Sequence, residues 1–260
     1  MKRLFSILMI LCLLPLCAIA ADEPKPIPVI AESDLTPTPK GVHHYMLICV
    51  DQWNAKANAL GHTDGLVLVT VDELAERVML TSFIRDMLIQ RPDGKFGRIN
   101  NVVTYFGDNQ AGVDQLIKTI NTHFDLKIEK YIVVDFGQVQ AIIDAVGGVD
   151  ITVTAHEAEY LRNYAISASS TKPRMAGAGT YHFTGHAAVI FMRIRRVLNS
   201  SGESQDLGRT RRVRTVLTTI ADSLKDITYD QAMQLMLIVG ENTCVTNMSS
   251  ADMLDALDLG

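Results

Sequence analysis

The sequence contains little cysteine and none of the motifs that mark the common classes of enzyme. Only four of its 260 residues are cysteines, of which Cys49 and Cys244 lie in the body of the chain. That number and spacing exclude a disulfide scaffold and a zinc site, and leave open whether these two residues form one bridge. Phosphate-binding loops, G-x-G-x-x-G turns, G-x-S-x-G elbows and H-E-x-x-H helices are missing. A nucleotide kinase, a dehydrogenase and a serine hydrolase are therefore disfavoured.

The chain also has no excess of positive charge. It carries 24 Lys and Arg residues against 29 Asp and Glu, a net charge of −5, whereas nucleic-acid-binding proteins usually show a basic excess. We therefore expect no nucleic-acid partner. The seven histidines have no zinc-site spacing. His43 and His44 adjoin on a predicted strand, and His182 and His186 border a predicted helix start, so we expect surface or capping roles for them.

The N-terminus has the three parts of an export signal. Residues 1–3 are basic, Leu4–Cys17 is an uncharged apolar run, and residues 18–20 form an A-x-A cleavage site. We expect residues 1–20 to be a signal peptide. A retained membrane anchor is the alternative, because the 18 residues from 4 to 21 approach the lower limit of about 17 for a membrane span. Either way, the folded part is expected outside the cytoplasm, secreted or tethered to the outer face of the cell membrane.

Beyond this signal the chain divides into a linker and a single domain. Residues 21–40 hold five of the eight prolines, which predicts an extended linker. In residues 41–260 strand-like runs alternate with helix-like ones. Strands are expected at 45–50, 66–71, 78–81, 131–134 and 149–153, and helices at 112–123, 136–146, 184–192, 208–225, 229–239 and 249–257. This order predicts an α/β fold with a central mixed β-sheet and helices on both faces.

Arginine is concentrated between residues 193 and 214. Seven arginines against Glu203 and Asp206 give this stretch of 22 residues a net charge of +5 (seven minus two). The planar guanidinium fork binds phosphate or carboxylate oxygens in a bidentate manner, which indicates an anion site. A solvated basic helix face is the alternative.

The apolar pattern of the predicted helix 208–225 separates these arginines into two groups. Its core-facing stripe comprises Val213, Val216, Leu217, Ile220 and Leu224. Arg209 and Arg212 lie one turn back along this stripe, where a charge is costly unless a partner is present. We therefore assign both to the anion site. Arg211 and Arg214 point away from the stripe and are expected at the surface.

Two further pairs of charged residues are candidates for the same site. Arg193 and Arg195 would point at one anion if the chain is extended there, because side chains repeat every two residues in extended chain. Asp51 and Asp64 adjoin predicted strands, at the sheet edge where α/β proteins place ligands. These two carboxylates could hold Mg²⁺ bridged to a phosphate. Turn or cap roles are the alternative for both.

Several short blocks together resemble the bacterial LytR-CpsA-Psr family of envelope proteins. In chain order they are G-H-T-D at 61–64, S-F-I-R-D at 82–86, R-I-N at 98–100, D-A-V-G-G-V-D at 144–150, R-I-R at 193–195, and D-L-G-R at 206–209 followed by Arg212. The family pattern is G-R-S-D, S-I-P-R-D, K-I-N, D-x-x-G-G-V, R-x-R and D-x-G-R-x-x-R-Q. The blocks keep this order over residues 41–225.

The resemblance implies a Mg²⁺-dependent phosphotransferase. Such an enzyme moves an anionic glycopolymer, of the teichoic acid or capsule type, from a polyprenyl pyrophosphate carrier at the membrane surface to peptidoglycan. By position, Asp51 and Asp64 would bind the metal. The arginines that would bind the pyrophosphate are Arg85, Arg193, Arg195, Arg209 and Arg212, the first four also serving catalysis. Asp86 and Asp206 would orient these arginines or accept the attacking proton, with a structural ion pair as the alternative.

Three positions depart from the family pattern. His62 replaces an arginine, Ile84 a proline and Val213 a glutamine. Of these, His62 exchanges a permanent charge for one that titrates near neutrality.

Two other functions are alternatives to the phosphotransferase. A non-catalytic envelope protein could bind polyanions through the same arginines. A transcriptional attenuator, which the older family name suggests, conflicts with the export signal and the acidic total charge.

Overall fold

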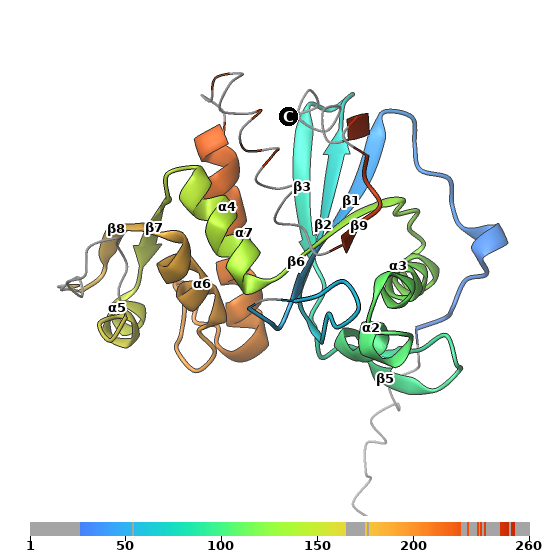
Figure 1. Cartoon of the computed structure of the whole chain (residues 1–260), viewed down its shortest axis with the longest axis horizontal. Helices are drawn as coiled ribbons and strands as arrows, with labels where there is room; N and C mark the ends of the chain where they lie inside the picture. The colour runs from blue at the N-terminus through green and yellow to red at the C-terminus, as the bar shows by residue number, and fades with distance from the viewer. Residues whose placement is uncertain are drawn as a thin grey trace, which may run out of the picture.

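The computed structural model describes residues 27–53, 55–164, 175, 177–224, 228, 233, 235, 237, 245–249 and 251–252. Within this part of the chain, the centre of the fold is a five-stranded sheet in the order β3-β2-β1-β6-β9 (Figure 1). Its strands are β1 (Val42–Val50), β2 (Thr63–Asp72), β3 (Arg77–Ser82), β6 (Lys130–Val134) and β9 (Val245–Thr246). β1 pairs antiparallel with β2 and parallel with β6. The mixed sheet that the sequence predicts is thereby confirmed.

Helices cover both faces of this sheet, as expected (Figure 1). On one face lie α2 (Val102–Tyr105) and α3 (Gln110–Phe124), and on the other α4 (Phe136–Ala145), α6 (Gly185–Arg193) and α7 (Gln205–Leu224). β1 contributes side chains to both faces, because successive side chains of a strand point to opposite faces of the sheet. Met46, Ile48 and Val50 are buried in the core beneath α2 and α3. Leu47 and Cys49 point the other way, toward α4 and α7.

The starts of several helices are fixed by side chains that accept hydrogen bonds from backbone N–H groups. Asn109 caps α3 and Thr184 caps α6. Asp135 and Thr154 each form a capping box, at α4 and at α5 (Ala155–Leu161) respectively. Such caps satisfy N–H groups that lack a partner within the helix. The caps at Asp135 and Thr184 thus set where α4 and α6 begin, and these two helices border the site described below.

One predicted strand lies outside the central sheet. β7 (Val149–Val153) pairs antiparallel with β8 (Gly179–Phe183) as a separate hairpin, which packs against α6 and α7. Its residues alternate between buried and exposed, the pattern of a strand covered on one side only. Several short elements were not predicted from the sequence. They include the strands β4 (Leu88–Gln90) and β5 (Phe96–Arg98), the 3₁₀ turn η2 (Ile99–Asn101), α2 and α5.

The described part of the proline-rich segment lies along α3 instead of extending away from the domain. Apart from the 3₁₀ turn η1 (Glu32–Asp34), residues 27–40 contain no helix or strand. The backbone N–H of Ile30 donates to the Thr122 carbonyl oxygen at 2.8 Å, and Thr36 Oγ1 donates to Asp125 Oδ2 at 2.6 Å. Residues 27–40 therefore pack on the domain. The predicted signal at 1–20 lies outside the described residues, as does most of the predicted helices 229–239 and 249–257.

No helix in the described ranges is long and apolar enough to cross a membrane.

A glycine sets the distance between α6 and α4. A Cβ atom added to Gly185 would overlap the backbone carbonyl oxygen of Gln140. We therefore expect Gly185→Ala to lower the free energy of unfolding by roughly 1–3 kcal/mol, as overpacking usually does. Gly177→Ala is the control, because an added Cβ there meets no atom within 4 Å. Urea denaturation measures both, and equal stability of the two variants would contradict this packing.

Candidate active site

Two arginines from distant parts of the chain converge on Asp64. Arg85, in the loop after β3, donates from Nη1 to Asp64 Oδ1. Arg209, in the first turns of α7, donates from Nη1 to Asp64 Oδ2 at 2.8 Å and from Nη2 to the Asp64 carbonyl oxygen at 2.9 Å. The Arg209 side chain is 9% exposed and that of Asp64 10%. Charge-assisted hydrogen bonds in such a sheltered place hold both guanidinium groups in fixed positions.

A β-bulge directs Asp64 toward these arginines. Cys49 pairs with Gly65, but Val50 pairs with Thr63, so Asp64 is the extra residue of β2. A bulge changes which face of a sheet the following side chains occupy. Thr63 is fully buried, whereas Asp64 and Gly65 both line a cavity on the α7 side of the sheet. In a regular strand, neighbouring residues would lie on opposite faces.

Asp206 lies among three guanidinium groups without a close hydrogen bond to any of them. Its Oδ1 atom is 3.5 Å from Arg85 Nε, 3.6 Å from Arg195 Nη2 and 4.0 Å from Arg209 Nη2. Among the described residues, this oxygen and Arg85 Nε are two of the few buried polar side-chain atoms without a hydrogen-bond partner. Buried polar groups rarely stay unpaired. These atoms are therefore available to a ligand.

Asp206 and Asp86 form a pair of carboxyl groups that hydrogen-bond to each other. Burial raises the pKa of Asp206, and the hydrogen bond with Asp86 raises it further. The same hydrogen bond lowers the pKa of Asp86, helped by the positive charge of Arg85. The two carboxyl groups influence each other, because the negative charge of one makes ionisation of the other less favourable. Asp206 is the member that keeps the proton to higher pH.

Arg193 and Arg195 border the same region from the end of α6. Arg193 is the last residue of the helix, and the chain leaves it at the buried Ile194, whose φ is −59° and ψ 125°. Arg195 joins the cluster through Asp206, and the Arg193 guanidinium lies 4.5 Å from the centre of the Phe136 ring. Such a cation–π contact leaves the edge of the guanidinium group available for hydrogen bonds.

Arg212 lies apart from this cluster, contrary to its expected role in binding pyrophosphate. It is buried, as the helical stripe predicts, at 1% exposure. However, Nε donates to Glu157 Oε1 at 2.7 Å, Nη1 to the Ile194 carbonyl oxygen at 2.9 Å and Nη2 to the Val197 carbonyl oxygen at 2.7 Å. Its partners are thus protein groups, and Arg212 holds the loop after α6, which carries Arg195.

Glu157 is the residue that sequence reasoning missed. It is 3% exposed and belongs to the capping box with Thr154 at the start of α5. The T-x-x-E spacing at 154–157 indicates such a box, but nothing in the spacing reveals that its carboxylate also neutralises Arg212. By contrast, Arg211 pairs with Glu203 at the surface, as expected.

A narrow apolar cavity of 60 Å³ opens beside the arginines, between the sheet and α4, α6 and α7. Asp64, Gly65, Arg193 and Arg209 are among its lining residues, and the others are Leu47, Cys49, Val67, Val134, Phe136, Val139, Met192, Val213 and Leu217. Val213, where the family pattern has glutamine, thus extends the apolar wall. The cavity has room for only a few carbon atoms, so a longer chain would need α4 and α7 to move away from the sheet.

The carboxylates present fit Mg²⁺ only if the ligand supplies further oxygens. Among the described residues, no three His, Cys, Asp or Glu side chains gather as a metal site. Asp51 is exposed, and its N–H donates to the His62 carbonyl oxygen at 2.8 Å, beside the start of β2. Asp51 and Asp64 therefore lie at the same end of the β1–β2 pair. One or two carboxylates completed by phosphate oxygens is a usual arrangement for Mg²⁺.

Whether Cys49 pairs with Cys244 stays open. Cys49 lies on β1 and its Sγ donates to the Val50 carbonyl oxygen at 3.9 Å, while Cys244 lies outside the described residues.

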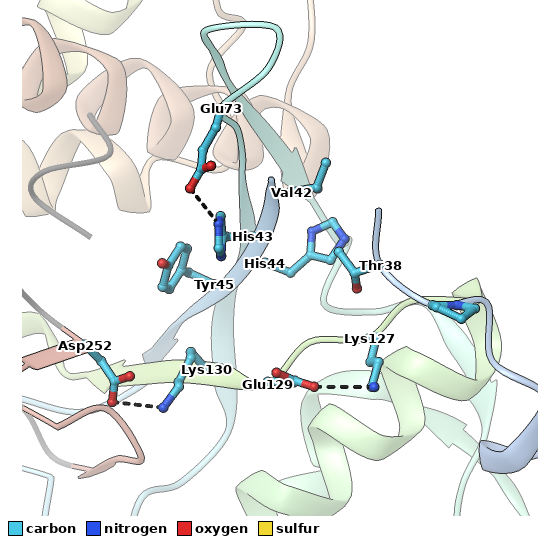
Figure 2. A pocket seen from close by; sticks show the side chains of 11 residues that line it. Thr38, Val42, His43, His44, Tyr45, Glu73, Lys127, Glu129, Lys130 and Asp252 are labelled. Carbon is cyan, nitrogen blue, oxygen red and sulfur yellow. Dashed lines mark hydrogen bonds and ion pairs between the residues drawn. The ribbon is translucent and has the colours of Figure 1, made fainter. Parts of the chain in front are cut away.

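A wider groove of 650 Å³ lies at the opposite end of β1, where Figure 2 shows it. It is roughly 20 Å along the strand from Asp51, at the usual rise per residue. Glu73 pairs with His43 at 2.9 Å, Asp252 with Lys130 at 2.9 Å and Glu129 with Lys127 at 3.6 Å. Both lysines of this groove are thus paired with a carboxylate, so the groove offers a diphosphate less charge than the arginine cluster does.

The burial of Arg212 allows its structural role to be tested. Arg212→Ala leaves Glu157 charged and buried without its partner, so we expect a loss of about 3–5 kcal/mol in the free energy of unfolding. Arg211→Ala, which breaks only a surface pair, should change it little. Chemical denaturation of both variants provides the measurement. Parental stability of Arg212→Ala would refute the structural role.

Comparisons with known proteins agree with this fold. The chain is 29% identical over 168 residues to Biofilm regulatory protein A of Streptococcus mutans, covering 62% of this chain and 38% of the relative. It is 29% identical over 207 residues to the teichoic acid transferase TagU of Oceanobacillus iheyensis, covering 78% and 58%. The chain therefore spans less than two thirds of these relatives.

Solved structures show the same fold. The crystal structure of Bacillus subtilis TagV superimposes with a TM-score of 0.64 at 21% identity, over 85% of this chain and 80% of that one. A structure described as TagT bound to LI-WTA gives 0.63 at 20% identity, over 85% and 74%. The sequence profile of the LytR_cpsA_psr family matches residues 25–258. The chain belongs to the LytR_cpsA_psr family.

Proposed function

We propose that this protein transfers an anionic glycopolymer from a polyprenyl diphosphate carrier to peptidoglycan. The observation that carries the proposal is the cluster of Arg85, Arg195 and Arg209 around Asp206, in which Arg85 and Arg209 are largely buried, beside an apolar cavity. A lipid diphosphate has the matching division into an apolar tail and a doubly charged head. The similarity to proteins named as teichoic acid transferases supports the same substrate class.

The arginines bind the diphosphate and Asp64 keeps them in place. Arg85 and Arg209 each use part of their five N–H groups on Asp64, and the remaining N–H groups can bind phosphate oxygens. Arg193 and Arg195 are more exposed and contact the diphosphate from the α6 side. Fixed donors of this kind stabilise the negative charge that develops in phosphoryl transfer.

The reaction is a substitution at phosphorus. The hydroxyl oxygen of the acceptor sugar bonds to the phosphorus that carries the glycopolymer, the bond to the lipid-side phosphate breaks, and polyprenyl phosphate leaves. The hydroxyl proton passes to Asp206, whose Oδ1 is buried and without a hydrogen bond within the described structure. Asp51 and Asp64 would hold Mg²⁺ together with the diphosphate oxygens, where the ion would neutralise charge on the transferred group.

The proposal places the protein outside the cytoplasm, secreted or tethered to the outer face of the bacterial cell membrane. A lipid-linked donor lies in the membrane and peptidoglycan lies beyond it, so the site must face that side. The predicted signal peptide, or alternatively membrane anchor, of residues 1–20 supports this location.

The non-catalytic alternative is a protein that only binds polyanions through the arginines. It differs from the proposed enzyme in two measurable ways. Transfer consumes the lipid-linked donor and depends on Mg²⁺, whereas binding leaves the donor intact and is insensitive to a chelator. The apolar cavity favours the enzyme, because a soluble polyanion has no use for it.

Arg209 provides the first test of the proposed function. With purified protein, a lipid-linked glycopolymer and peptidoglycan, Arg209→Ala should transfer about 10²–10³-fold more slowly than the parent, since it removes charge stabilisation from the transition state. Arg211→Ala is the matched control, because it lies two residues away on the surface of α7 and should leave the rate unchanged. Near-parental transfer by Arg209→Ala would rule the mechanism out.

The raised pKa of Asp206 predicts how the rate depends on pH. A carboxyl group accepts a proton only when it is ionised. The transfer rate should therefore be at its full value above the pKa of Asp206 and should decline as the pH falls through that pKa. Because that pKa is raised, the decline begins at a higher pH than for an ordinary aspartate. Asp206→Asn should slow transfer by roughly 10²–10⁴-fold, whereas Asp206→Glu should keep a decline at low pH. A parental rate and profile in the asparagine variant would exclude this role.

A further inference from the structure

Trp53 is an exposed aromatic residue beside the candidate active site. It is the single tryptophan of the chain and is 40% exposed. Its ring contacts Phe136, with centroids 5.7 Å apart, and His186, with centroids 6.2 Å apart. Part of the indole is therefore packed, while the rest faces solvent. Tryptophan is enriched at binding interfaces, because its ring is large and apolar while its N–H can form a hydrogen bond.

The loop that carries Trp53 is tied to the start of α4. The N–H of Phe136 donates to the Gln52 carbonyl oxygen at 2.9 Å, and the N–H of Ala55 donates to Asp135 Oδ2 at 2.7 Å. Asp135 is only 2% exposed. At Gly137 a Cβ atom would approach the Trp53 carbonyl oxygen to 2.7 Å, so the loop lies against the helix backbone. Trp53 is thus held in position before any ligand binds, which lowers the entropic cost of binding.

Trp53 lies where the polar end of the donor would emerge. It follows the proposed metal ligand Asp51 by two residues. It also shares Phe136 with Arg193, since both side chains contact that ring. Phe136 in turn lines the apolar cavity. With the lipid tail in the cavity and the diphosphate on the arginines, the next group along the donor is a sugar, and it would reach this rim.

The chemistry of the rim fits a pyranose ring. One face of such a ring presents C–H groups that pack on an indole, and its hydroxyl groups can hydrogen-bond to an imidazole such as that of His186. We infer that Trp53 is a stacking surface for the pyranose ring of the sugar next to the reacting diphosphate. This inference rests on the proposed function and adds the sugar subsite to it.

Ligand binding at Trp53 can be measured directly by fluorescence, because Trp53 is the single tryptophan and all indole emission comes from it. UDP-N-acetylglucosamine carries a hexosamine on a diphosphate, UDP carries the diphosphate without the sugar, and a soluble disaccharide-peptide of peptidoglycan carries the sugars alone. A saturable emission change with UDP-N-acetylglucosamine beyond that of UDP assigns the ring to the donor. A change with the disaccharide-peptide assigns it to the acceptor. No change with either sugar-bearing ligand would overturn the inference.

Transfer kinetics provide an independent readout. Trp53→Ala should raise KM by about tenfold, the equivalent of about 1.4 kcal/mol, while Trp53→Phe keeps an aromatic face and should recover most of this loss. Phe96→Ala is the control, since Phe96 is 55% exposed on β5, beside α2 on the other side of the sheet (Figure 1). An unchanged KM in Trp53→Ala would contradict the inference. If the parent shows no transfer at all, the proposed function fails, but the fluorescence titration still tests the sugar subsite.

Discussion

The site depends on one interaction, the bridge that Asp64 forms between Arg85 and Arg209. These residues come from β2, from the loop after β3 and from α7, so the bridge fixes three separate elements at one point. Two guanidinium groups this close repel each other, and desolvation lowers the pKa of Arg209. The Asp64 carboxylate offsets both effects. Without it, the two arginines could not remain together in a sheltered place.

The second arginine of α7 shows how position, not residue type, decides a role. Arg209 and Arg212 are both buried and lie on the same side of the helix. Arg209 lines the cavity and pairs with Asp64, whereas Arg212 is surrounded by Glu157 and two carbonyl oxygens. Arg212 thereby fixes the loop after α6, which carries Arg195, relative to α7. One arginine contributes to the site and the other to its framework.

The sequence predicted the mixed sheet, the helices on both faces and the burial of Arg209 and Arg212, because these follow from hydrophobic periodicity. It could not place β7 outside the central sheet, since strand pairing depends on partners far along the chain. It could not show that Asp64 lies in a bulge, because register is set between strands. The partner of Arg212 and the exposed side of Trp53 were likewise hidden, since both depend on helices that meet only in the folded protein.

The central claim is that the arginine cluster and the apolar cavity bind the two halves of a single ligand. A crystal structure of the protein with a short polyprenyl diphosphate, such as farnesyl diphosphate, tests it most directly. The account predicts a diphosphate within hydrogen-bond distance of Arg85, Arg195 and Arg209, with the tail between the sheet and α7 where Val67 and Val213 lie. A diphosphate bound in the groove of His43 and Lys130, or a tail lying outside the cavity, would contradict it.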